Sequence, residues 1–340
     1  MRSFKKILFR AVALVLFTVL LEWGIRFCYQ EWKAFTVVSR QEREELQGTL
    51  DTLYCGNSLT YRGFCPALLD EKLGTNSFNL GTSQQTLSGV YYLLRETAEQ
   101  NPIKKVYLGL SISMLKEEMP DEAYVSAAEN FCSPVWKMRY LMAVGREPVF
   151  VSSLLFSTRV ETYMAFSKVK TNIRSKLSGR KSSSRYGKRG WRTSSKKYAG
   201  KGQERNADGK YWDKELGISQ LQQESLTYLK KITEFCNENE IQLTWVFMPL
   251  SQPFVDGAGD MDDLNETLGG LAEEFGAEYY NFILYKERKT VFTNDKFKDS
   301  THLNTEGSKV FSTLLSEIVS SKNPGDYFYG SMEEYKEEQI

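Results

Sequence analysis

The chain has few of the residues from which metal and redox sites are usually built. Among its 340 residues there is one histidine, His302, and the five cysteines show no CxxC pairing and no other metal-ligand spacing. This composition argues against a zinc site, and we expect no metal and no cofactor. The sequence also has no internal repeat and no glycine-rich loop of the kind that holds phosphates.

An excess of charge of one sign is absent as well. The formal net charge is +1, so the overall charge does not indicate a partner. Hydrophobic residues make up 41% of the chain and charged residues 26%, which is ordinary for a globular protein. The length suits one large domain or two smaller ones.

For Cys55 and Cys65, a disulfide and a pair of free buried thiols are both compatible with the sequence.

An apolar segment opens the chain and is long enough to cross a bilayer. The strictly apolar run covers residues 11–21, and the helical pattern extends over residues 7–27 if Arg10 and Glu22 reach toward the interfaces. That gives about the 20 residues that a span requires. No A-x-A-like cleavage site follows, which favours an uncleaved signal anchor over a cleaved signal peptide. The basic residues in front of the run are Arg2, Lys5, Lys6 and Arg10.

The position of these basic residues predicts the sidedness and the domain plan. Positive charge before a span keeps the N-terminus cytoplasmic, so we expect a single-pass protein of the cell membrane with its domain on the extracytoplasmic side. Residues 1–28 would form the cytoplasmic tip and anchor, and residues 29–48 a charged juxtamembrane stalk. Residues 49–322 would form the domain, with a basic insert at 168–214, and residues 323–340 an acidic tail.

Strand and helix patterns alternate along the domain. Short strands are predicted over residues 49–55, 76–80 and 105–110, and a helix from Thr82 or Ser83 carries apolar residues at i, i+3, i+4 and i+7. The second half continues with helices over 218–240, 261–275 and 304–320, and with strands over 242–248 and 278–284. The tail after Ser331 is expected to fray. The alternation predicts an α/β domain with a parallel sheet.

Three residues at the two ends of this domain suggest nucleophilic catalysis. Ser58 follows the first predicted strand, at the sheet edge where sites of open α/β folds assemble. Asp299 stands three residues before His302, a spacing that lets its carboxylate accept the Nδ1–H and leaves Nε2 free as a base. A base of this kind needs a nucleophile, and serine is its usual partner. The alternative is a lone surface histidine that caps the last helix.

The sequence around these residues resembles the SGNH/GDSL hydrolase superfamily. Gly56-Asn57-Ser58-Leu59, Asn79-Leu80-Gly81 and Asp299-Ser300-Thr301-His302 look like its first, second and fifth sequence blocks. The resemblance implies a three-layer flavodoxin-like fold, Ser58 as the nucleophile, and an oxyanion hole made by the backbone N–H groups of Ser58 and Gly81.

The chain departs from the pattern of this superfamily at two places. Asn57 stands where the first block has aspartate. After the third strand, Gly109-Leu110-Ser111-Ile112 stands where the third block has G-x-N-D, so the side-chain donor to the oxyanion is missing or is replaced by Ser111 or Ser113.

An anchor followed by such a domain is similar to the SGNH-like proteins of cell-envelope acylation. These include DltD-type teichoic-acid D-alanylation proteins and alginate-type polysaccharide O-acetyltransferases. The resemblance implies an acyl donor, an envelope polymer or exopolysaccharide as acceptor, and a membrane-bound O-acyltransferase as a partner.

The insert at residues 168–214 is dense in basic residues and has no apolar period. One interpretation is a solvated, partly mobile surface excursion. The other is a surface for an anionic polymer, with aromatic side chains that stack on sugars. Nucleic acid is excluded, because the anchor places the insert on the wrong side of the membrane. The candidate polymer-binding residues are Arg180, Lys181, Arg185, Lys188, Arg189 and Trp191.

Three functions are therefore open at this point. The first is acyl transfer through a Ser58 ester to a hydroxyl of an envelope polymer. The second is a carbohydrate or lipid esterase with the same triad and water as acceptor. The third is a non-catalytic module that recruits polymer to a membrane acyltransferase.

Overall fold

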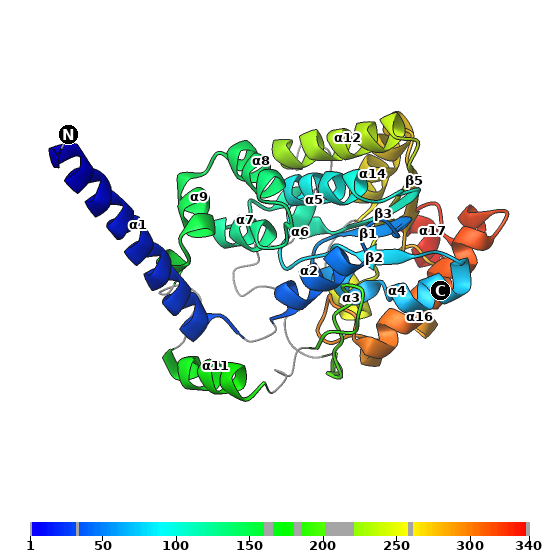
Figure 1. The fold of residues 1–340 in the computed structure, drawn as a ribbon. Helices are drawn as coiled ribbons and strands as arrows, with labels where there is room; N and C mark the ends of the chain where they lie inside the picture. The colour runs from blue at the N-terminus through cyan, green and yellow to red at the C-terminus, as the bar shows by residue number, and fades with distance from the viewer. Residues whose placement is uncertain are drawn as a thin grey trace.

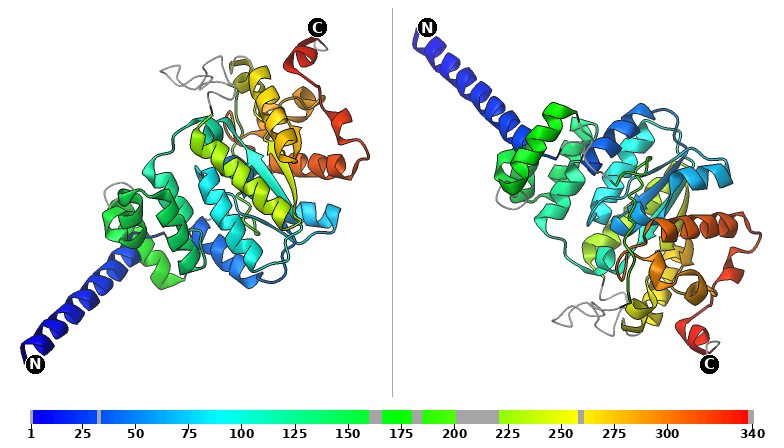
Figure 2. Two further views of the ribbon diagram at one scale, coloured as in Figure 1. Left: turned by 90° about the horizontal axis from the view of Figure 1, so that it is seen from above. Right: turned by 90° about the horizontal axis from the view of Figure 1, so that it is seen from below.

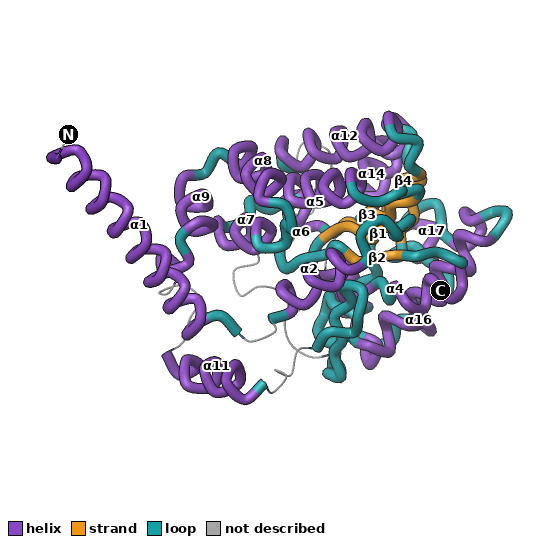
Figure 3. The backbone as a smooth tube through the Cα atoms, viewed as in Figure 1, coloured by secondary structure: helices purple, strands orange, loops and turns teal. Residues whose placement is uncertain are grey.

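A parallel sheet forms the centre of the molecule. The computed structural model describes residues 2–31, 34–159, 166–179, 185–200, 221–257 and 261–337. Helices cover both faces of the five-stranded sheet (Figures 1 and 3). The strand order β2-β1-β3-β4-β5 is that of the flavodoxin-like fold. The predicted α/β class, with three layers and a parallel sheet, is confirmed.

The strands are short and mostly buried, as expected for a sheet covered on both faces. Strand β5 ends earlier than the predicted residue 284. The Asn281 side chain accepts a hydrogen bond from the Ile283 amide at 3.0 Å and so turns the chain. The five strands are β1 (Thr52–Gly56), β2 (Ser77–Asn79), β3 (Lys105–Leu110), β4 (Gln242–Phe247) and β5 (Glu278–Asn281).

Helices lie on both faces of the sheet, and their apolar sides close the main core (Figure 1). On one face lie α5 (Leu87–Glu99), α12 (Gln223–Glu238) and α14 (Asp262–Phe275). On the other lie α3 (Ser58–Gly63), α4 (Pro66–Leu73) and α16 (Thr305–Ser320). Helix α16 agrees with the prediction, and the Asn304 side chain caps it by accepting from the Gly307 amide at 3.0 Å.

Two predicted helix starts are wrong. Helix α5 begins at Leu87 rather than at residue 82 or 83, because the Thr86 hydroxyl caps it by accepting from the Gly89 amide at 3.2 Å. The Thr82 amide instead donates to the Gln85 side chain at 3.0 Å, which holds the segment in a turn. Helix α12 begins at Gln223: residues 221 and 222 are not helical, and residues 218–220 of the predicted helix lie outside the described part of the chain.

A group of helices after β3 forms a second hydrophobic core that the sequence did not predict. Buried side chains of α7 and α8, among them Tyr124, Trp136 and Tyr140, pack there beside Leu93 of α5. The elements of this group are α6 (Ile112–Lys116), α7 (Asp121–Ala128), α8 (Pro134–Val144), α9 (Glu147–Leu154) and η1 (Phe156–Arg159).

The N-terminal segment forms α1 (Arg2–Tyr29), a helix long and apolar enough to cross a membrane. Most of it projects away from the domain (Figure 2). The segment predicted as a stalk contains α2 (Phe35–Glu45), which packs on the domain. Arg43 of α2 is buried and pairs with buried Glu96 at 2.8 Å, so this part is not a free stalk.

Residues 185–200 of the basic insert cover the outer edge of the sheet, and we name them the edge strap. The Arg189 carbonyl accepts a hydrogen bond from the Asn79 amide at 2.9 Å, which protects the open edge of β2. Gly190 has a φ of +78°, and a Cβ there would lie 2.0 Å from the Asn79 carbonyl oxygen. Trp191 is 8% exposed. From the sequence, the insert is interpreted as a surface excursion or a polymer-binding surface, whereas these contacts make the edge strap part of the fold.

The C-terminal segment is ordered up to residue 337 rather than frayed. Met332 and Tyr335 of α17 (Met332–Glu337) are buried in the main core, and buried Arg288 donates to the Tyr335 hydroxyl at 3.1 Å.

The five cysteines are free thiols, so Cys55 and Cys65 form no disulfide. The remaining elements are α11 (Phe166–Ser178), α13 (Gln252–Gly257), α15 (Arg288–Val291), η3 (Asn294–Lys296) and η4 (Pro324–Tyr327).

Candidate active site

Ser58 lies at the carboxyl end of β1, on a sharp turn into α3. Gly56, the last residue of β1, has a φ of +145°, and a Cβ there would lie 2.1 Å from the Thr60 hydroxyl. Only glycine fits this turn. The Asn57 side chain then caps α3 by accepting from the Leu59 amide at 3.0 Å. As the first residue of α3, Ser58 is held at the sheet edge where the sequence placed it.

The loop before α16 holds the acid and the base. Phe297 and Leu303 form an isolated antiparallel bridge, and both side chains are buried. The Lys298 amide donates to the His302 carbonyl at 2.8 Å, which closes the loop. The Asp299 carboxylate also accepts from the His302 amide at 2.9 Å. Residues 299–302 are thus fixed as one tight turn.

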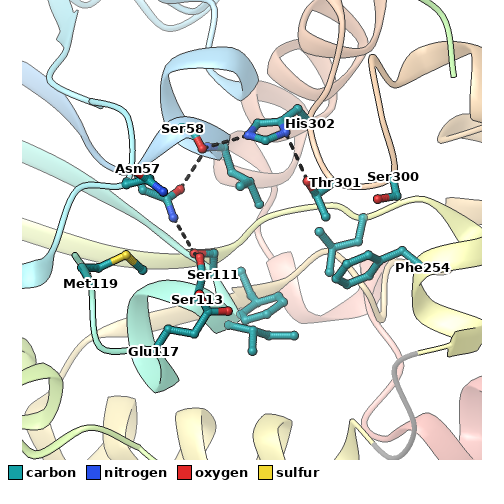
Figure 4. Close-up of a pocket in the computed structure, with 15 residues that line it drawn as sticks. Asn57, Ser58, Ser111, Ser113, Glu117, Met119, Phe254, Ser300, Thr301 and His302 are labelled. Carbon is teal, nitrogen blue, oxygen red and sulfur yellow. Dashed lines mark hydrogen bonds between the residues drawn. The ribbon is translucent and has the colours of Figure 1, made fainter. Parts of the chain in front are cut away.

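The three predicted residues meet in the structure. The Ser58 hydroxyl lies 2.8 Å from Nε2 of His302 (Figure 4), and Nδ1 of the same ring lies 2.8 Å from Oδ1 of Asp299. A carboxylate only accepts hydrogen bonds, so Nδ1 carries the ring proton and Nε2 presents its lone pair to the Ser58 hydroxyl. The prediction that Ser58 and Asp299 lie on opposite sides of the imidazole is confirmed.

Several donors hold Asp299 in its charged form. Burial works in the opposite direction and raises its pKa, but the hydrogen bond and charge of His302 outweigh burial. Lys298 adds to this effect, because its Nζ lies 2.7 Å from Oδ2. The net result is an Asp299 pKa well below its ordinary value. The carboxylate therefore stays ionised whenever His302 acts as a base.

Thr301 also contacts the base, and the sequence did not single it out. Its hydroxyl lies 3.2 Å from Nδ1 of His302 (Figure 4) and 3.4 Å from Oδ1 of Asp299. Thr301 lies between the two residues in the chain, so this contact belongs to the same tight turn. It gives the imidazole a second polar neighbour on its Asp299 side.

The donors available for an oxyanion differ from the prediction. Among the described residues, the Ser58 amide has no hydrogen-bond acceptor, so it is free to donate. The Gly81 amide, in contrast, donates to the Asn79 side chain at 2.9 Å, and Gly81 does not line the cavity. The structure therefore does not bring Gly81 to the site in the predicted role.

A network of side chains occupies the place of the missing third-block asparagine. The Ser111 hydroxyl accepts from Nδ2 of Asn57 at 2.6 Å and lies 3.3 Å from the Ser113 hydroxyl (Figure 4). It also accepts from the Met114 amide at 3.4 Å. With its lone pairs occupied, Ser111 has its own O–H left to donate. Asn57 orients Ser111, although the sequence offered no sign of this contact between residues 54 positions apart.

These side chains line a cavity of about 320 Å³. Glu117 supplies its only carboxylate (Figure 4), and within the described residues this side chain has no hydrogen-bond or ion-pair partner. Burial raises the Glu117 pKa. The lining residues are Asn57, Ser58, Leu59, Gln84, Ser111, Ile112, Ser113, Glu117, Met119, Phe247, Leu250, Phe254, Ser300, Thr301 and His302.

The candidate polymer-binding residues do not lie in this cavity. Arg180 and Lys181 fall outside the described residues. Arg185 and Lys188 are exposed on the edge strap. Arg189 instead donates to Asn76 at 2.6 Å and to the Ser77 carbonyl at 2.9 Å, and Trp191 is buried, so both take part in the fold.

No cluster of three or more metal-ligating side chains occurs in the described parts of the chain.

Comparison with known proteins yields similarity at the level of structure only. No family model and no curated protein matches the sequence. A solved structure of a candidate acylhydrolase from Bacteroides fragilis is 12% identical, with a TM-score of 0.36, over 82% of this chain and 93% of that one. A candidate platelet activating factor from Streptococcus pneumonia is 11% identical, with a TM-score of 0.41, over 90% and 98%.

Proposed function

We propose that the chain is a membrane-anchored serine acyltransferase of the SGNH type. The observation that carries the proposal is the relay from Ser58 through His302 to Asp299, with 2.8 Å at both steps, beside a cavity that can hold an acyl group. The α1 helix supports the anchor, and the cell membrane with an extracytoplasmic domain is the proposed location. The proposed acceptor is a hydroxyl of an envelope polymer or exopolysaccharide, with O-acetyl or D-alanyl as the acyl group. A membrane-bound O-acyltransferase is the proposed partner.

The first half-reaction makes an ester on Ser58. The Ser58 hydroxyl attacks the carbonyl carbon of the donor, and its proton passes to Nε2 of His302. Asp299 stabilises the imidazolium ion without taking its proton. The Ser58 amide and the Ser111 hydroxyl donate to the oxyanion. When the bond to the leaving group breaks, His302 returns the proton to that group, and the acyl chain remains on Ser58.

The second half-reaction uses the same groups in reverse. His302 removes the proton of the acceptor hydroxyl, the acceptor oxygen attacks the acyl carbon, and the bond to Ser58 Oγ breaks with return of the proton. A polymer hydroxyl as acceptor makes the enzyme a transferase. Water as acceptor makes it an esterase, which is the second candidate function, and the same relay supports both.

Covalent labelling tests the nucleophile. Wild-type protein should react with a serine-directed fluorophosphonate, and Ser58→Ala should abolish the label. His302→Ala should suppress it, because no other histidine exists to act as the base. Ser113→Ala is a matched control, since it removes another cavity hydroxyl and should keep the label. Label that persists in Ser58→Ala would contradict the assignment, and a wild type without label or ester turnover would favour the non-catalytic module.

Product analysis then separates transfer from hydrolysis. With a small acetyl ester as donor, addition of a polysaccharide should divert the acyl group from free acid to the polymer if the enzyme is a transferase. The matched control is the same polysaccharide with its hydroxyls blocked, which should divert nothing. If free acid stays the only product at every acceptor concentration, the esterase function is correct.

A further inference from the structure

We infer that the outer faces of α8 and α9 form a second membrane contact, in which the domain rests on the phospholipid surface beside α1. Five apolar side chains make up this surface, which we name the interfacial patch. The inference rests on the proposed membrane span of α1, but not on the chemistry of Ser58. The patch consists of Val135, Met138, Met142, Leu154 and Leu155.

The joint between α1 and the domain is fixed rather than hinged. The Glu22 carboxylate accepts hydrogen bonds from the Ser157 amide at 2.9 Å and from the Ser157 hydroxyl. The Arg26 guanidinium lies 5.1 Å from the centre of the Phe156 ring, which is buried. These contacts hold the end of α1 against η1. The direction of the span therefore determines how the domain meets the membrane.

Contacts with α11 hold the end of α1 from a second side. The Asn172 amide group donates to the Tyr29 carbonyl at 2.9 Å, and the Lys176 ammonium donates to the Gln30 carbonyl at 2.6 Å. These bonds give partners to carbonyls at the end of α1 and just after it, where intrahelical hydrogen bonds run out. Contacts from two separate elements, η1 and α11, thus hold the last two turns of α1 in place.

Glu22 also marks the level at which the membrane surface crosses α1. Every large apolar side chain from Phe4 to Leu21 is exposed, which fits lipid, whereas the Glu22 carboxylate binds the domain. Leu154 and Leu155 directly precede η1, which contacts Glu22. They are 48% and 39% exposed and stand three and two residues before Ser157, which binds Glu22. A side chain at this level meets the lipid interface.

Helix α8 extends the apolar surface beyond α9. Val135, Met138 and Met142 follow one another at i, i+3 and i+7, and are 60%, 37% and 72% exposed. Figure 2 shows the green helices of this group at the end of the domain nearest α1 in both views. Single exposed apolar residues are common on soluble proteins. This stripe instead lies on a helix that packs against α9, and α9 leads into η1, which packs against α1.

The chemistry around the patch indicates phospholipid with anionic headgroups. Exposed Arg139 lies on α8 within the stripe, and α11 carries three exposed basic residues next to the base of α1. Apolar side chains flanked by Lys and Arg are typical of segments that lie in the interface of an anionic membrane. Methionine side chains adapt readily to irregular apolar surroundings such as acyl chains. The three residues on α11 are Lys168, Lys170 and Arg174.

Photo-crosslinking of the full chain tests this contact. Benzoylphenylalanine would replace Met142, Leu155, Phe17 or Lys309, one position at a time, in vesicles of phosphatidylcholine with phosphatidylglycerol. Phe17 reports the span of α1. Lys309, exposed on α16 in the other helix layer, is the matched control. After illumination, mass spectrometry should find phospholipid adducts at 142, 155 and 17, and none at 309.

The possible results distinguish failure of the interfacial patch from failure of the proposed function, including its membrane span. Adducts at 17 without adducts at 142 and 155 would overturn the patch and leave the span intact. Loss of the adduct at 17 would overturn the span. Crosslinks at 142 to a second copy of the chain would identify a self-association surface and overturn the lipid assignment. Fluorophosphonate labelling of each variant verifies that the domain is folded and keeps its site.

Discussion

At the scale of single residues, the site is built from contacts between distant parts of the chain. The spacing of Asp299 and His302 revealed one contact, because it is local. The hydrogen bond from Asn57 to Ser111 is not local, so the sequence could suggest Ser111 as a substitute donor but not explain how it is oriented. The hydrogen bond from the Gly81 amide to Asn79 is local, but the sequence did not reveal it, because both residues match the expected motif.

Ser111→Ala should reduce catalysis without unfolding the protein. The substitution removes one donor to the oxyanion, a change that costs about 10²–10³-fold in kcat in enzymes of this kind. KM should change little, because the interaction strengthens only in the transition state. Steady-state kinetics with a small ester measure both constants. Equal kcat for Ser111→Ala and the Ser113→Ala control would exclude the assigned role.

Glu117→Gln should stabilise the protein in a pH-dependent manner. The folded-state pKa of Glu117 is raised by burial, so the folded protein binds this proton more tightly than the unfolded chain does. At pH values above the ordinary glutamate pKa of about 4.3, the charged form of Glu117 therefore lowers the free energy of unfolding. In acid Glu117 is protonated, and this loss of stability disappears. The melting temperature of Glu117→Gln should exceed that of wild type at pH 7 and match it near pH 3.

The control for this measurement is Glu238→Gln, at an exposed position near the end of α12. It should leave the melting temperature nearly unchanged at both pH values. A stability gain for Glu117→Gln that persists in acid would point to a cause other than the buried charge.

At the scale of elements, the sequence predicted the sheet better than the helices. The first and third strands are short apolar runs, and the second ends at the turn residue Gly81; these signals are local. The start of α5 was ambiguous because Thr82, Ser83 and Thr86 are all capping residues, and tertiary contacts of Thr82 decide between them. For the helices of the second core, α7 to α9, the sequence does not indicate which faces are buried, because these faces become apparent only when the helices pack together.

Neutralising the exposed charges of the edge strap should leave the stability of the protein nearly unchanged, whereas replacing its packing residues should lower it. Gly190→Ala forces a Cβ into the Asn79 carbonyl at a positive φ, and Trp191→Ala leaves a cavity, so each should cost about 2–4 kcal/mol. Lys188→Gln and Arg185→Gln, on the same strap, should stay within about 0.5 kcal/mol of wild type. Urea unfolding measures all four. A neutral Gly190→Ala would show that the strap does not hold the edge of β2.

At the scale of the whole molecule, hydrogen bonds from η1 and α11 join the end of α1 to the rest of the chain. We predict that the native protein keeps residues 1–28, because no small-residue cleavage site follows the apolar run of α1. The intact mass of protein purified from membranes should therefore equal that of the full chain. A mature form that begins after residue 20 would contradict the anchor and, with it, the fixed joint at Glu22.

The single histidine has a consequence for spectroscopy. A chain labelled with ¹⁵N only at histidine would give one imidazole spin system, and it would belong to the Ser58–Asp299 relay without any assignment step. The two ring nitrogens would report tautomer and protonation directly, in detergent or in bilayers. Formation of the Ser58 ester removes the hydroxyl proton that Nε2 now accepts, so the resonance of that nitrogen would follow acylation in real time.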